Sequence, residues 1–249
     1  MILRAYPENR EEIRRLCGSG ALGTRIYGTF LAYGDETPGV AFWISPDAVF
    51  GLTDGALTIA GCPGEAHRDE IRFFVESIGP QTIVCSPETA ELLGFKIVRQ
   101  GPALVRENPG ETVPCGGVAR AEELGLRKLC GFLCDCETET FQVPEAGMFY
   151  IDVSHRVRHG AADGVLFEHE GTVLACALAG AVTETDALIS AVAVLPQVRR
   201  RGLGRLAVDE LCERLRGRRC HALRAEDENA EFYAVLGFEE NGRWAECTL

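Results

Sequence analysis

A short stretch rich in arginine and glycine, residues 195–205, carries the residue types best suited to ligand chemistry. It reads LPQVRRRGLGR, so four arginines stand within seven residues. Gly202 and Gly204 lack a Cβ, which lets backbone N–H groups approach a ligand, and the N–H groups at the start of a following helix attract an anion. The stretch therefore indicates a pyrophosphate site. The alternative is a solvated basic turn that needs glycine only for its shape.

The charge of the whole chain makes this basic stretch unusual. Of 249 residues, 37 are acidic and 25 are basic, and the formal net charge is -12. A chain of this sign is repelled by nucleic acid and by anionic membranes, so we expect neither as a partner. The phosphate-binding pattern G-x-x-x-x-G-K-[ST] and the dinucleotide pattern G-x-G-x-x-G do not occur in the sequence.

The second half of the chain supplies the elements that must position this stretch. Hydrophobic periodicity predicts strands at 164–169, 172–180 and 187–195, the last leading into the basic stretch. A strand at 221–226, a short helix and a last strand at 243–248 are expected further on. Between them an amphipathic helix places five apolar residues on one face: Leu203, Leu206, Ala207, Leu211 and Leu215.

The first half repeats this order of elements. We expect strands at 29–33, 39–45, 55–61 and 82–86, helices at 67–78 and 87–93, and a closing hairpin that reaches residue 107. The heptapeptides that begin at Asp54 and Asp186 are alike, and so are residues 91–95 and 234–238, which indicates an internal repeat. A junction at 107–117, rich in proline and glycine, separates a domain at 1–110 from one at 111–249. Both are predicted to be α+β, a mixed sheet with flanking helices.

Two ordered motifs in the second half resemble a known family. Arg199-x-x-Gly202-x-Gly204 resembles the acyl-CoA-binding signature [QR]-x-x-G-x-[GA] of the GNAT superfamily of acyl-CoA-dependent N-acyltransferases. Residues 229–238, NAEFYAVLGF, are similar to the second signature of that family, a short helix that carries a tyrosine and is followed by Gly-Phe. The resemblance covers about residues 120–249, and the first half is interpreted as a degenerate GNAT-like domain.

The resemblance implies a role for each residue that matches a motif. The strand end Val192, Ala193 and Val194 would bind the pantetheine arm of acetyl-CoA through the main chain of its two valines. The turn that follows would hold the pyrophosphate with Arg199, Arg200, Arg201, Gly202, Leu203, Gly204 and Arg205. Tyr233 would be the general acid that protonates the departing thiolate, and Asn229 would share its helix face and contact pantetheine.

These two roles each have a structural alternative. The asparagine of the family usually stands seven residues before the tyrosine, where this chain has Glu226. Asn229 is therefore also a plausible helix-start residue. Tyr233 is equally consistent with packing against Phe232 and Phe238.

The general base and the acceptor site are predicted from the residue types alone. Glu184 is a candidate base if a pocket raises its pKa, and Ser190 is expected to line the same site; the alternative is a polar hairpin turn at 183–186. The segment 149–160 is interpreted as a recognition or lid segment, or else as a structural ion-pair cluster. Its candidate substrate-binding residues are Asp152, His155, Arg156 and Arg158.

No metal site is expected. His155 and His159 stand four apart but lack the carboxylate of an H-E-x-x-H motif. Cys130, Cys134 and Cys136 lack the paired C-x2-C knuckles of a structural zinc site, and Cys130 and Cys134, four apart, also fit one buried helical face, which is the interpretation we favour.

Together these features predict an N-acetyltransferase that moves an acetyl group from acetyl-CoA to the amine of a small molecule or peptide by direct attack. The alternative is a non-catalytic acyl-CoA-binding sensor or interaction module. The first domain would have a structural or acceptor-site role. The N-terminus has no signal-peptide pattern and no window is apolar enough to span a membrane, so we expect a soluble, cytoplasmic protein. Its partners are expected to be the amine acceptor and, in a homodimer, a second copy of the chain.

Overall fold

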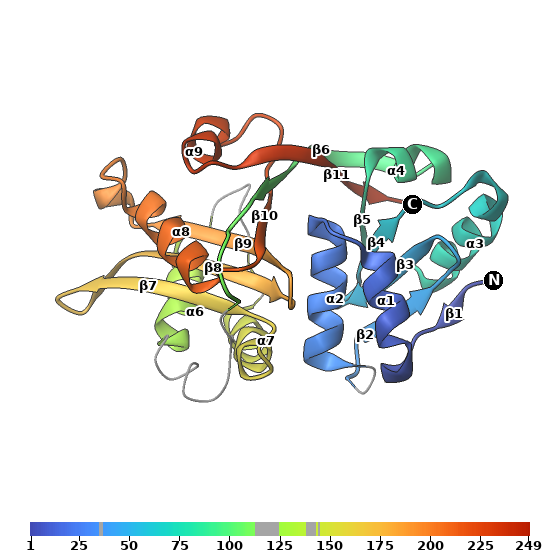
Figure 1. Ribbon diagram of the computed structural model, residues 1–249, viewed down its shortest axis with the longest axis horizontal. Coiled ribbons are helices and arrows are strands. Elements are labelled where there is room, and N and C mark those ends of the chain that lie inside the picture. The colour runs from blue at the N-terminus through green and yellow to red at the C-terminus, as the bar shows by residue number, and fades with distance from the viewer. Residues whose placement is uncertain (35–36, 113–124, 138–142, 144) are drawn as a thin grey trace. The chain divides into compact units, whose positions relative to one another are not determined.

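The computed structural model describes residues 1–34, 37–112, 125–137, 143 and 145–249, and the chain divides into two compact units (Figure 1). The first unit contains Met1–Val105, Leu223–Ala230 and Glu239–Leu249, and the second contains Arg106–Ala222 and Glu231–Phe238. The sequence indicated a boundary near residue 110. The first unit also recruits two segments from the C-terminal part of the chain, which local patterns did not reveal.

The second unit is built on a four-stranded mixed sheet. Its strands are β7 (Asp163–His169), β8 (Thr172–Val182), β9 (Asp186–Val194) and β10 (Arg219–Leu223), in the order β10-β9-β8-β7. β10 runs parallel to β9, and the other neighbours are antiparallel. These four strands correspond to the four strands that the sequence predicts between residues 164 and 226.

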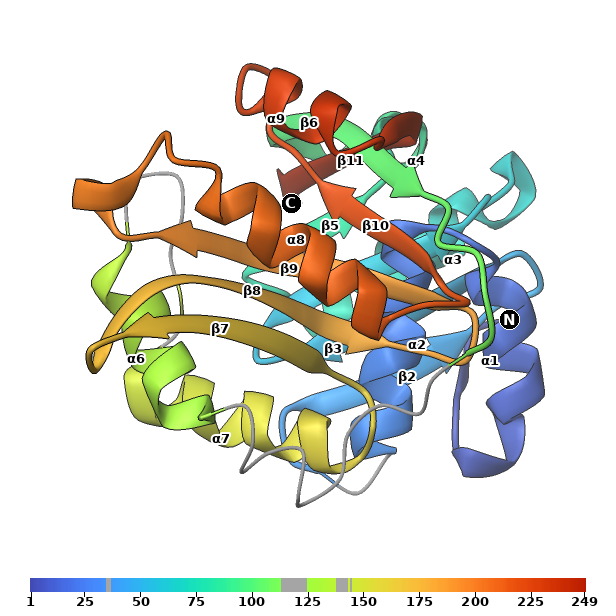
Figure 2. The same ribbon diagram turned by 60° about the vertical axis from the view of Figure 1, so that its left-hand side comes forward.

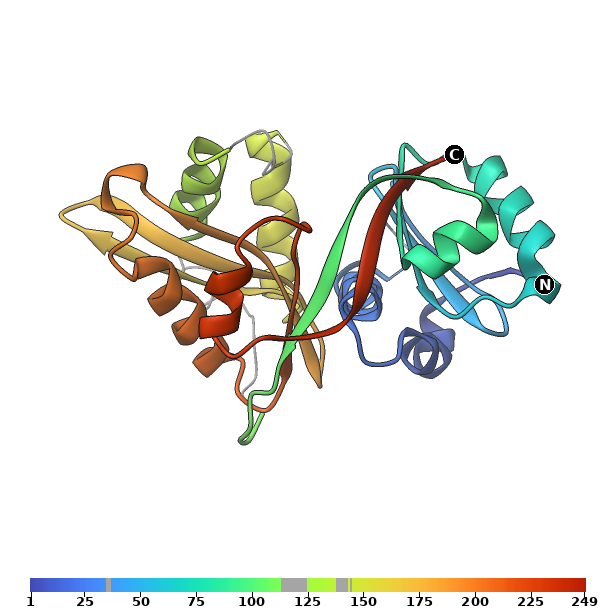
Figure 3. The same cartoon turned by 90° about the horizontal axis from the view of Figure 1, so that it is seen from above.

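Helices cover both faces of this sheet, as Figure 3 shows. α8 (Leu203–Arg214) packs on one face, and α6 (Leu126–Asp135) and α7 (Ala146–Arg158) pack on the other. α8 follows the predicted amphipathic helix, but Leu206 is 55% exposed and Val208 is buried in its place. The apolar face of α8 is thus rotated relative to the predicted one.

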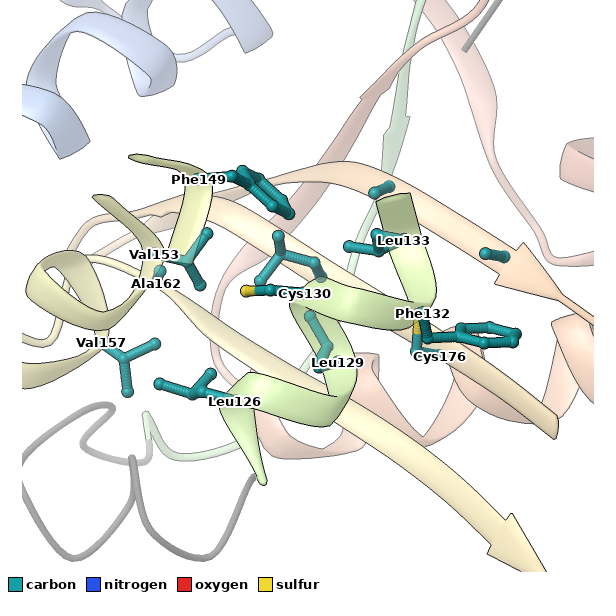
Figure 4. Packing of buried hydrophobic residues seen from close by; sticks show 13 residues of the cluster. Leu126, Leu129, Cys130, Phe132, Leu133, Phe149, Val153, Val157, Ala162 and Cys176 are labelled. Atoms are coloured by element: carbon teal, nitrogen blue, oxygen red, sulfur yellow. The ribbon is translucent and has the colours of Figure 1, made fainter. Parts of the chain in front are cut away.

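A buried cluster beneath α6 and α7 forms one core of the second unit (Figure 4). Leu126, Leu129 and Leu133 recur at the spacing of one helical face and pack with α7 and with the strands. Cys130 is buried in the same cluster, and Cys134 and Cys136 are partly buried against it. The cysteine spacing therefore follows the packing of α6.

The first unit has a seven-stranded sheet in the order β1-β2-β3-β4-β5-β11-β6. Its strands are β1 (Leu3–Arg4), β2 (Val40–Ile44), β3 (Ala48–Thr53), β4 (Ala56–Gly61), β5 (Thr82–Cys85), β6 (Lys96–Arg106) and β11 (Glu239–Thr248). β11, the last strand of the chain, lies antiparallel to both β5 and β6. Trp244, Ala245 and Cys247 of β11 are buried, so the C-terminal strand contributes to the core of the N-terminal unit.

Helices also lie on both faces of the first sheet (Figure 3). α1 (Arg10–Cys17) and α2 (Ala21–Tyr33) belong to one buried cluster, and α3 (Arg68–Ile78) and α4 (Pro87–Leu93) to another. α4 begins where Ser86 accepts a hydrogen bond from the N–H of Thr89 and Pro87 fills the first helical position. The predicted helices at 67–78 and 87–93 are thereby confirmed.

Two predictions for the first half are wrong. Residues 29–33 belong to α2 and not to a strand, because a short apolar run does not distinguish a buried helix from a strand. The closing hairpin is a single long strand, β6, whose partner β11 comes from the end of the chain. In the described ranges of the chain, no helix is long and apolar enough to cross a membrane.

Candidate active site

The predicted pyrophosphate-binding stretch forms a tight turn between β9 and α8. A 3-10 turn, Pro196–Val198, is followed by Arg199, by Arg200 with φ 66°, and by Gly202 with φ 81° at the N-cap of α8. The first backbone N–H groups of a helix have no partner within that helix, and the positive end of its dipole lies there. Arg199, Arg200, Arg201 and Arg205 are exposed around this helix start, so the turn combines amide donors with mobile positive charge.

Gly204 allows the helix start to approach its neighbours closely. A Cβ at this position would lie 3.2 Å from Cγ2 of Val194 and 3.5 Å from Cε2 of Phe232, which is carried by α9 (Ala230–Val235). A larger side chain would therefore separate α8 from the end of β9. Gly202 is constrained differently, because its positive φ is a conformation that other residues adopt only with strain.

β9 and β10 stop pairing before β9 reaches this turn. The two strands pair from Asp186 to Ile189 on β9, and the remaining residues of β9, 190–194, continue without β10 (Figure 2). The N–H of Leu195 donates to the carbonyl of Leu174 at 2.9 Å, so this position faces β8. Main-chain groups alternate in direction along a strand. Those of Val192 and Val194 therefore point away from β8, toward the side of β9 that β10 leaves unpaired, which we call the parted edge of β9.

The carbonyl of Val194 accepts a hydrogen bond from Nε of Arg199 at 3.1 Å, which agrees with this orientation. A strand edge with outward N–H and C=O groups binds an extended chain that contains amides by adding it as a further strand. The parted edge of β9 thus fits an amide-bearing arm. Residues 195–205 at its end, which we call the arginine turn, fit a pyrophosphate.

A pair of irregularities bends β8 and β9 beside this edge. The register shifts on both strands, leaving Gly180 and Ser190 without a directly paired residue. Oγ of Ser190 accepts from the N–H of Gly180 at 3.2 Å and donates to the carbonyl of Leu188 at 3.3 Å. A Cβ at Gly180 would lie 2.6 Å from this Oγ. Ser190 therefore shapes the strand, and its catalytic role stays a prediction.

Glu184 lies in the turn that joins β8 to β9. The N–H of Thr183 donates to the carbonyl of Asp186 at 2.8 Å, and the hydroxyl of Thr183 accepts from the N–H of Thr185 at 3.3 Å, so the polar turn is well formed. β9 has 9 residues, and at about 3.3 Å per residue its ends are roughly 25 Å apart. Glu184 is exposed at the end far from the arginine turn, and its role as a base stays a prediction.

Tyr233 is half-buried between two aromatic rings. Its ring lies edge-on to Phe232 at 5.2 Å and to Phe238 at 5.5 Å. The packing proposed as an alternative is therefore present, and a role as general acid stays a prediction. Asn229 has φ 54° and precedes α9, which begins at Ala230. The expectation that Asn229 and Tyr233 share a helix face is corrected, since Asn229 lies in the turn that leads to the helix.

The predicted recognition segment 149–160 is largely the helix α7. Nε of Arg156 contacts Oδ1 of Asp152 at 2.8 Å, and Nη1 of Arg156 donates to the carbonyl of Gly180 at 3.3 Å. Arg158 donates to Oγ of Ser154. The structural ion-pair interpretation is thus realised for Arg156, whose guanidinium is held by groups of its own unit rather than presented to an acceptor carboxylate.

The two histidines of α7 stack on each other at the end of the helix. The rings of His155 and His159 are 4.1 Å apart, and Nδ1 of His159 lies 2.9 Å from the carbonyl of His155. No group of three or more histidine, cysteine or carboxylate side chains within the described residues is arranged to hold a metal ion. The pair therefore has an evident packing role on the helix surface.

A buried polar cluster that sequence reasoning missed holds the paired ends of β9 and β10. Asp186 contacts Nε2 of His221 at 2.8 Å, Nε of Arg219 at 3.0 Å and Oγ1 of Thr185 at 2.6 Å. Burial alone would raise the pKa of Asp186, but the hydrogen bonds from His221, Thr185 and Arg219 outweigh it, and the net shift is downward. The only signal in the sequence was the place of Asp186 in the internal repeat.

Comparison with known proteins agrees with this geometry. The model of the Acetyltransferase (GNAT) family matches residues 126–238. A GCN5-related N-acetyltransferase from Kribbella flavida has 19% sequence identity and a TM-score of 0.59, and the match covers 92% of this chain and 95% of that one. No curated protein matches the sequence.

Two further structures share the fold over nearly the whole chain. A tandem GNAT protein from the clavulanic acid biosynthesis pathway has 13% identity and a TM-score of 0.57, with 99% of this chain and 97% of that chain covered. A GCN5-related N-acetyltransferase from Sphaerobacter thermophilus has 12% identity and a TM-score of 0.59, with 99% and 94% covered. At these identities the likeness establishes the fold, consistent with two GNAT-like domains in tandem. The sequence match and the shared fold show that residues 126–238 are an acetyltransferase domain of the GNAT family.

Proposed function

We propose that the second unit transfers an acetyl group from acetyl-CoA to the amine of a small molecule or peptide by direct attack. The observation that carries the proposal is the parted edge of β9, where the main-chain groups of Val192 and Val194 face outward and lead into the arginine turn. An acyl-CoA has the matching order of parts, an amide-bearing arm followed by a pyrophosphate. General acyl-CoA-dependent acetyl transfer is the chemistry of the family.

The residues of the second unit divide the work between binding and proton transfer. Acetyl-CoA supplies the reactive thioester. Val192 and Val194 hold its pantetheine arm, and the amides and guanidinium groups of residues 199–205 hold its pyrophosphate. Tyr233 would donate a proton to the leaving thiolate, since a phenol is an ordinary general acid when it lies within hydrogen-bond reach. Direct attack needs no acyl-enzyme, so no nucleophilic serine or cysteine is assigned.

Calorimetric titration with acetyl-CoA tests the binding site. Gly204→Val should weaken binding by about 100-fold or more, because the new side chain would push α8 away from Val194 and Phe232. Gly64→Val, in the equivalent turn of the first unit, is the matched control; Gly64 has φ -88° and a Cβ there would meet Asp47 only at 3.4 Å. Equal affinity of the Gly204 variant and the native protein would remove the assignment of the turn.

A second experiment separates catalysis from binding alone. A panel of amines is screened for release of the free CoA thiol from acetyl-CoA, and Tyr233→Phe is compared with the native protein. We expect the variant to lower kcat by about 100-fold with little change in acetyl-CoA affinity. Tight acetyl-CoA binding with no CoA release for any amine would instead favour the non-catalytic sensor, in which Tyr233 only packs between two phenylalanines.

A further inference from the structure

The carboxylate of Asp152 stands beside the bent part of the β8–β9 pair and is fixed there by a buried arginine. Asp152 and Arg156 are one turn apart on α7, with 2.8 Å between Oδ1 and Nε. Nη1 of the same guanidinium reaches the carbonyl of Gly180, the irregular residue opposite Ser190, at 3.3 Å. The side chain of Arg156 is 9% exposed and that of Asp152 is 36% exposed. The arginine is therefore internal, and the carboxylate it orients reaches solvent.

α7 packs on β8, and Arg156 links Asp152 to the place where β8 and β9 are irregular. Phe149 and Val153, which flank Asp152 in the sequence, belong to the same buried cluster as Ala191 and Ala193 of β9. Gly180 lies opposite Ser190, the first residue of β9 beyond its pairing with β10. Asp152 is therefore linked through Arg156 to the point where the unpaired edge of β9 begins.

A carboxylate in such a place has a defined chemical use. An amine dissolved at neutral pH is mostly an ammonium ion, and it must lose a proton before its nitrogen can attack a thioester. A fixed carboxylate attracts the cation, orients its N–H bonds and accepts the proton directly or through water. A carboxylate oxygen can accept several hydrogen bonds at once, so one carboxylate can contact both an arginine and an ammonium group.

We propose that Asp152 receives the ammonium group of the acceptor and accepts its proton, and that Arg156 is the positioning residue for Asp152. The inference rests on the proposed function. One proton passes from the ammonium to Asp152 and then to water. The amine nitrogen forms a bond to the acetyl carbonyl carbon, and the carbon–sulfur bond breaks. The second proton leaves the nitrogen for water, Tyr233 gives its proton to the CoA thiolate, and the phenolate of Tyr233 regains one proton from water, so the products are an N-acetyl amide, CoA thiol and one released proton.

This assignment favours a cationic acceptor over an anionic one. The guanidinium of Arg156 is engaged by Asp152 and Gly180, so an acceptor carboxylate would meet the negative charge of Asp152 instead of a presented arginine. The neighbouring thiol of Cys130 adds no charge beside Asp152. Across from it on α6, burial and the neighbouring Cys134 and Asp152 raise the pKa of the Cys130 thiol to about 12, so the thiol is neutral at ordinary pH.

Two small nucleophiles of different charge test the proposal without knowledge of the natural acceptor. Ethylamine is a cation at neutral pH, whereas hydroxylamine is largely neutral. Release of the CoA thiol from acetyl-CoA is measured with each one, using the full chain. Asp152→Asn should slow the reaction of ethylamine by about 100-fold and that of hydroxylamine by less than about 3-fold, because only the cation needs a base and an anionic partner. Asp69→Asn on α3 of the first unit, where Asp69 is exposed, is the charge-matched control.

The positioning role of Arg156 is read from the same two nucleophiles. Arg156→Gln should slow the reaction of ethylamine by about 10-fold more than that of hydroxylamine, because the carboxylate that meets the cation is no longer oriented, and Arg156→Lys should restore part of the ethylamine rate. A merely structural arginine would slow both reactions equally. Asp152→Glu, which keeps the charge, separates loss of the carboxylate from any loss of folding in Asp152→Asn.

The possible results separate the role of Asp152 from the binding of acetyl-CoA on which that role depends. Equal loss with both nucleophiles, or no loss with either, overturns the role of Asp152. A native protein that binds acetyl-CoA but accelerates neither nucleophile overturns it as well. Failure to bind acetyl-CoA at all would instead remove the proposed function on which the inference rests, and the calorimetric titration distinguishes that case.

Discussion

The two strand-to-helix turns of the molecule occupy equivalent places in their units but present opposite chemistry. In the second unit, residues 195–205 offer exposed arginines around the start of α8. In the first unit, residues 61–69 are bound by their own neighbour: Oδ2 of Asp47 accepts from the N–H of Gly64 at 2.9 Å and lies 3.1 Å from Nδ1 of His67. A carboxylate of the chain itself therefore sits where an external anion would have to bind.

The strands that lead to these turns also differ between the two units, in the length of their unpaired edge. β4 and β5 pair from Ala56 to Thr58, which leaves only residues 59–61 of β4 beyond the pairing. In the second unit five residues of β9 run on past β10. β3 and β4 also pair without a register shift, whereas β8 and β9 carry the irregularity at Gly180 and Ser190. The first unit has the same kind of fold, but the unpaired edge of β4 is shorter than that of β9, and β3 and β4 have no irregularity.

On the proposed function, this difference means that the two units share a fold while only the second offers the binding site. Burial of apolar residues supports each fold, but an anion site depends on a few unpaired donors and on the absence of an internal competitor. We expect the carboxylate, the shorter free edge and the fewer arginines of the first unit to be enough to exclude an anion there. The fold of that unit is supported by its buried clusters.

The largest expected effect follows from removing β11, because the first unit is completed by the end of the chain. A chain that stops at Phe238 would lose Trp244, Ala245 and Cys247 from the core and leave β5 and β6 without their shared partner. The loss of the tryptophan alone is worth about 3–5 kcal/mol, which is a large part of the stability of an ordinary domain. Hydrogen exchange should show unprotected β5 and β6, and native protection there would contradict the assignment of β11 to this core.

Asp186→Asn should produce the next largest effect, about 3 kcal/mol of lost stability, since it leaves Arg219 and His221 without their buried anion. Asp54→Asn is the matched control, because Asp54 aligns with Asp186 in the repeat but is exposed in a turn. Denaturant unfolding of both variants measures the difference. A loss of similar size in both would mean that the cluster adds nothing to the second unit.

The same cluster fixes the sign of a pH dependence. Because the pKa of Asp186 is lowered in the folded protein, its contribution to stability is present above the pKa of an unfolded aspartate, about 3.9, and is lost as the pH falls through the folded value. The native protein should therefore lose more stability than Asp186→Asn on acidification below about pH 4. Parallel curves for the two proteins would exclude a linked proton at this site.

Much of the fold and of the turn at residues 195–205 was predictable from the sequence, because both depend on local patterns. Apolar periodicity located β7, β8, β9 and α8, and the spacing of Gly202 and Gly204 located the turn. The pairing of β11 with strands of the first unit was not predictable, since its apolar pattern indicates a strand but does not show which strands it pairs with. The contact of Arg156 with Gly180 and the Asp186 cluster depend on contacts between elements distant in sequence, which periodicity does not encode.

A smaller effect is expected from the charge of the turn. Replacing Arg200 and Arg201 together with glutamine should weaken acetyl-CoA binding by about 10-fold, because exposed charges act through solvent and are screened. The affinity of the variant should also depend less on salt than that of the native protein. Arg68→Gln in the first unit, exposed at the start of α3, should change neither quantity. An unchanged salt dependence in the double variant would place the anion elsewhere.

The smallest effect, and the sharpest test of the comparison, is expected from Asp47→Asn in the first unit. The change removes the internal anion that Gly64 and His67 bind, and its cost is about 1 kcal/mol, because the side chain is partly exposed and the neutral amide oxygen still accepts a hydrogen bond. If the carboxylate were the only obstacle, the variant would bind a second acetyl-CoA. We expect the stoichiometry to stay at one, since the free edge of β4 is short and unbent and the turn lacks the four arginines. A second calorimetric site would mean that anion competition alone, and not the shape of the strand, separates the two units.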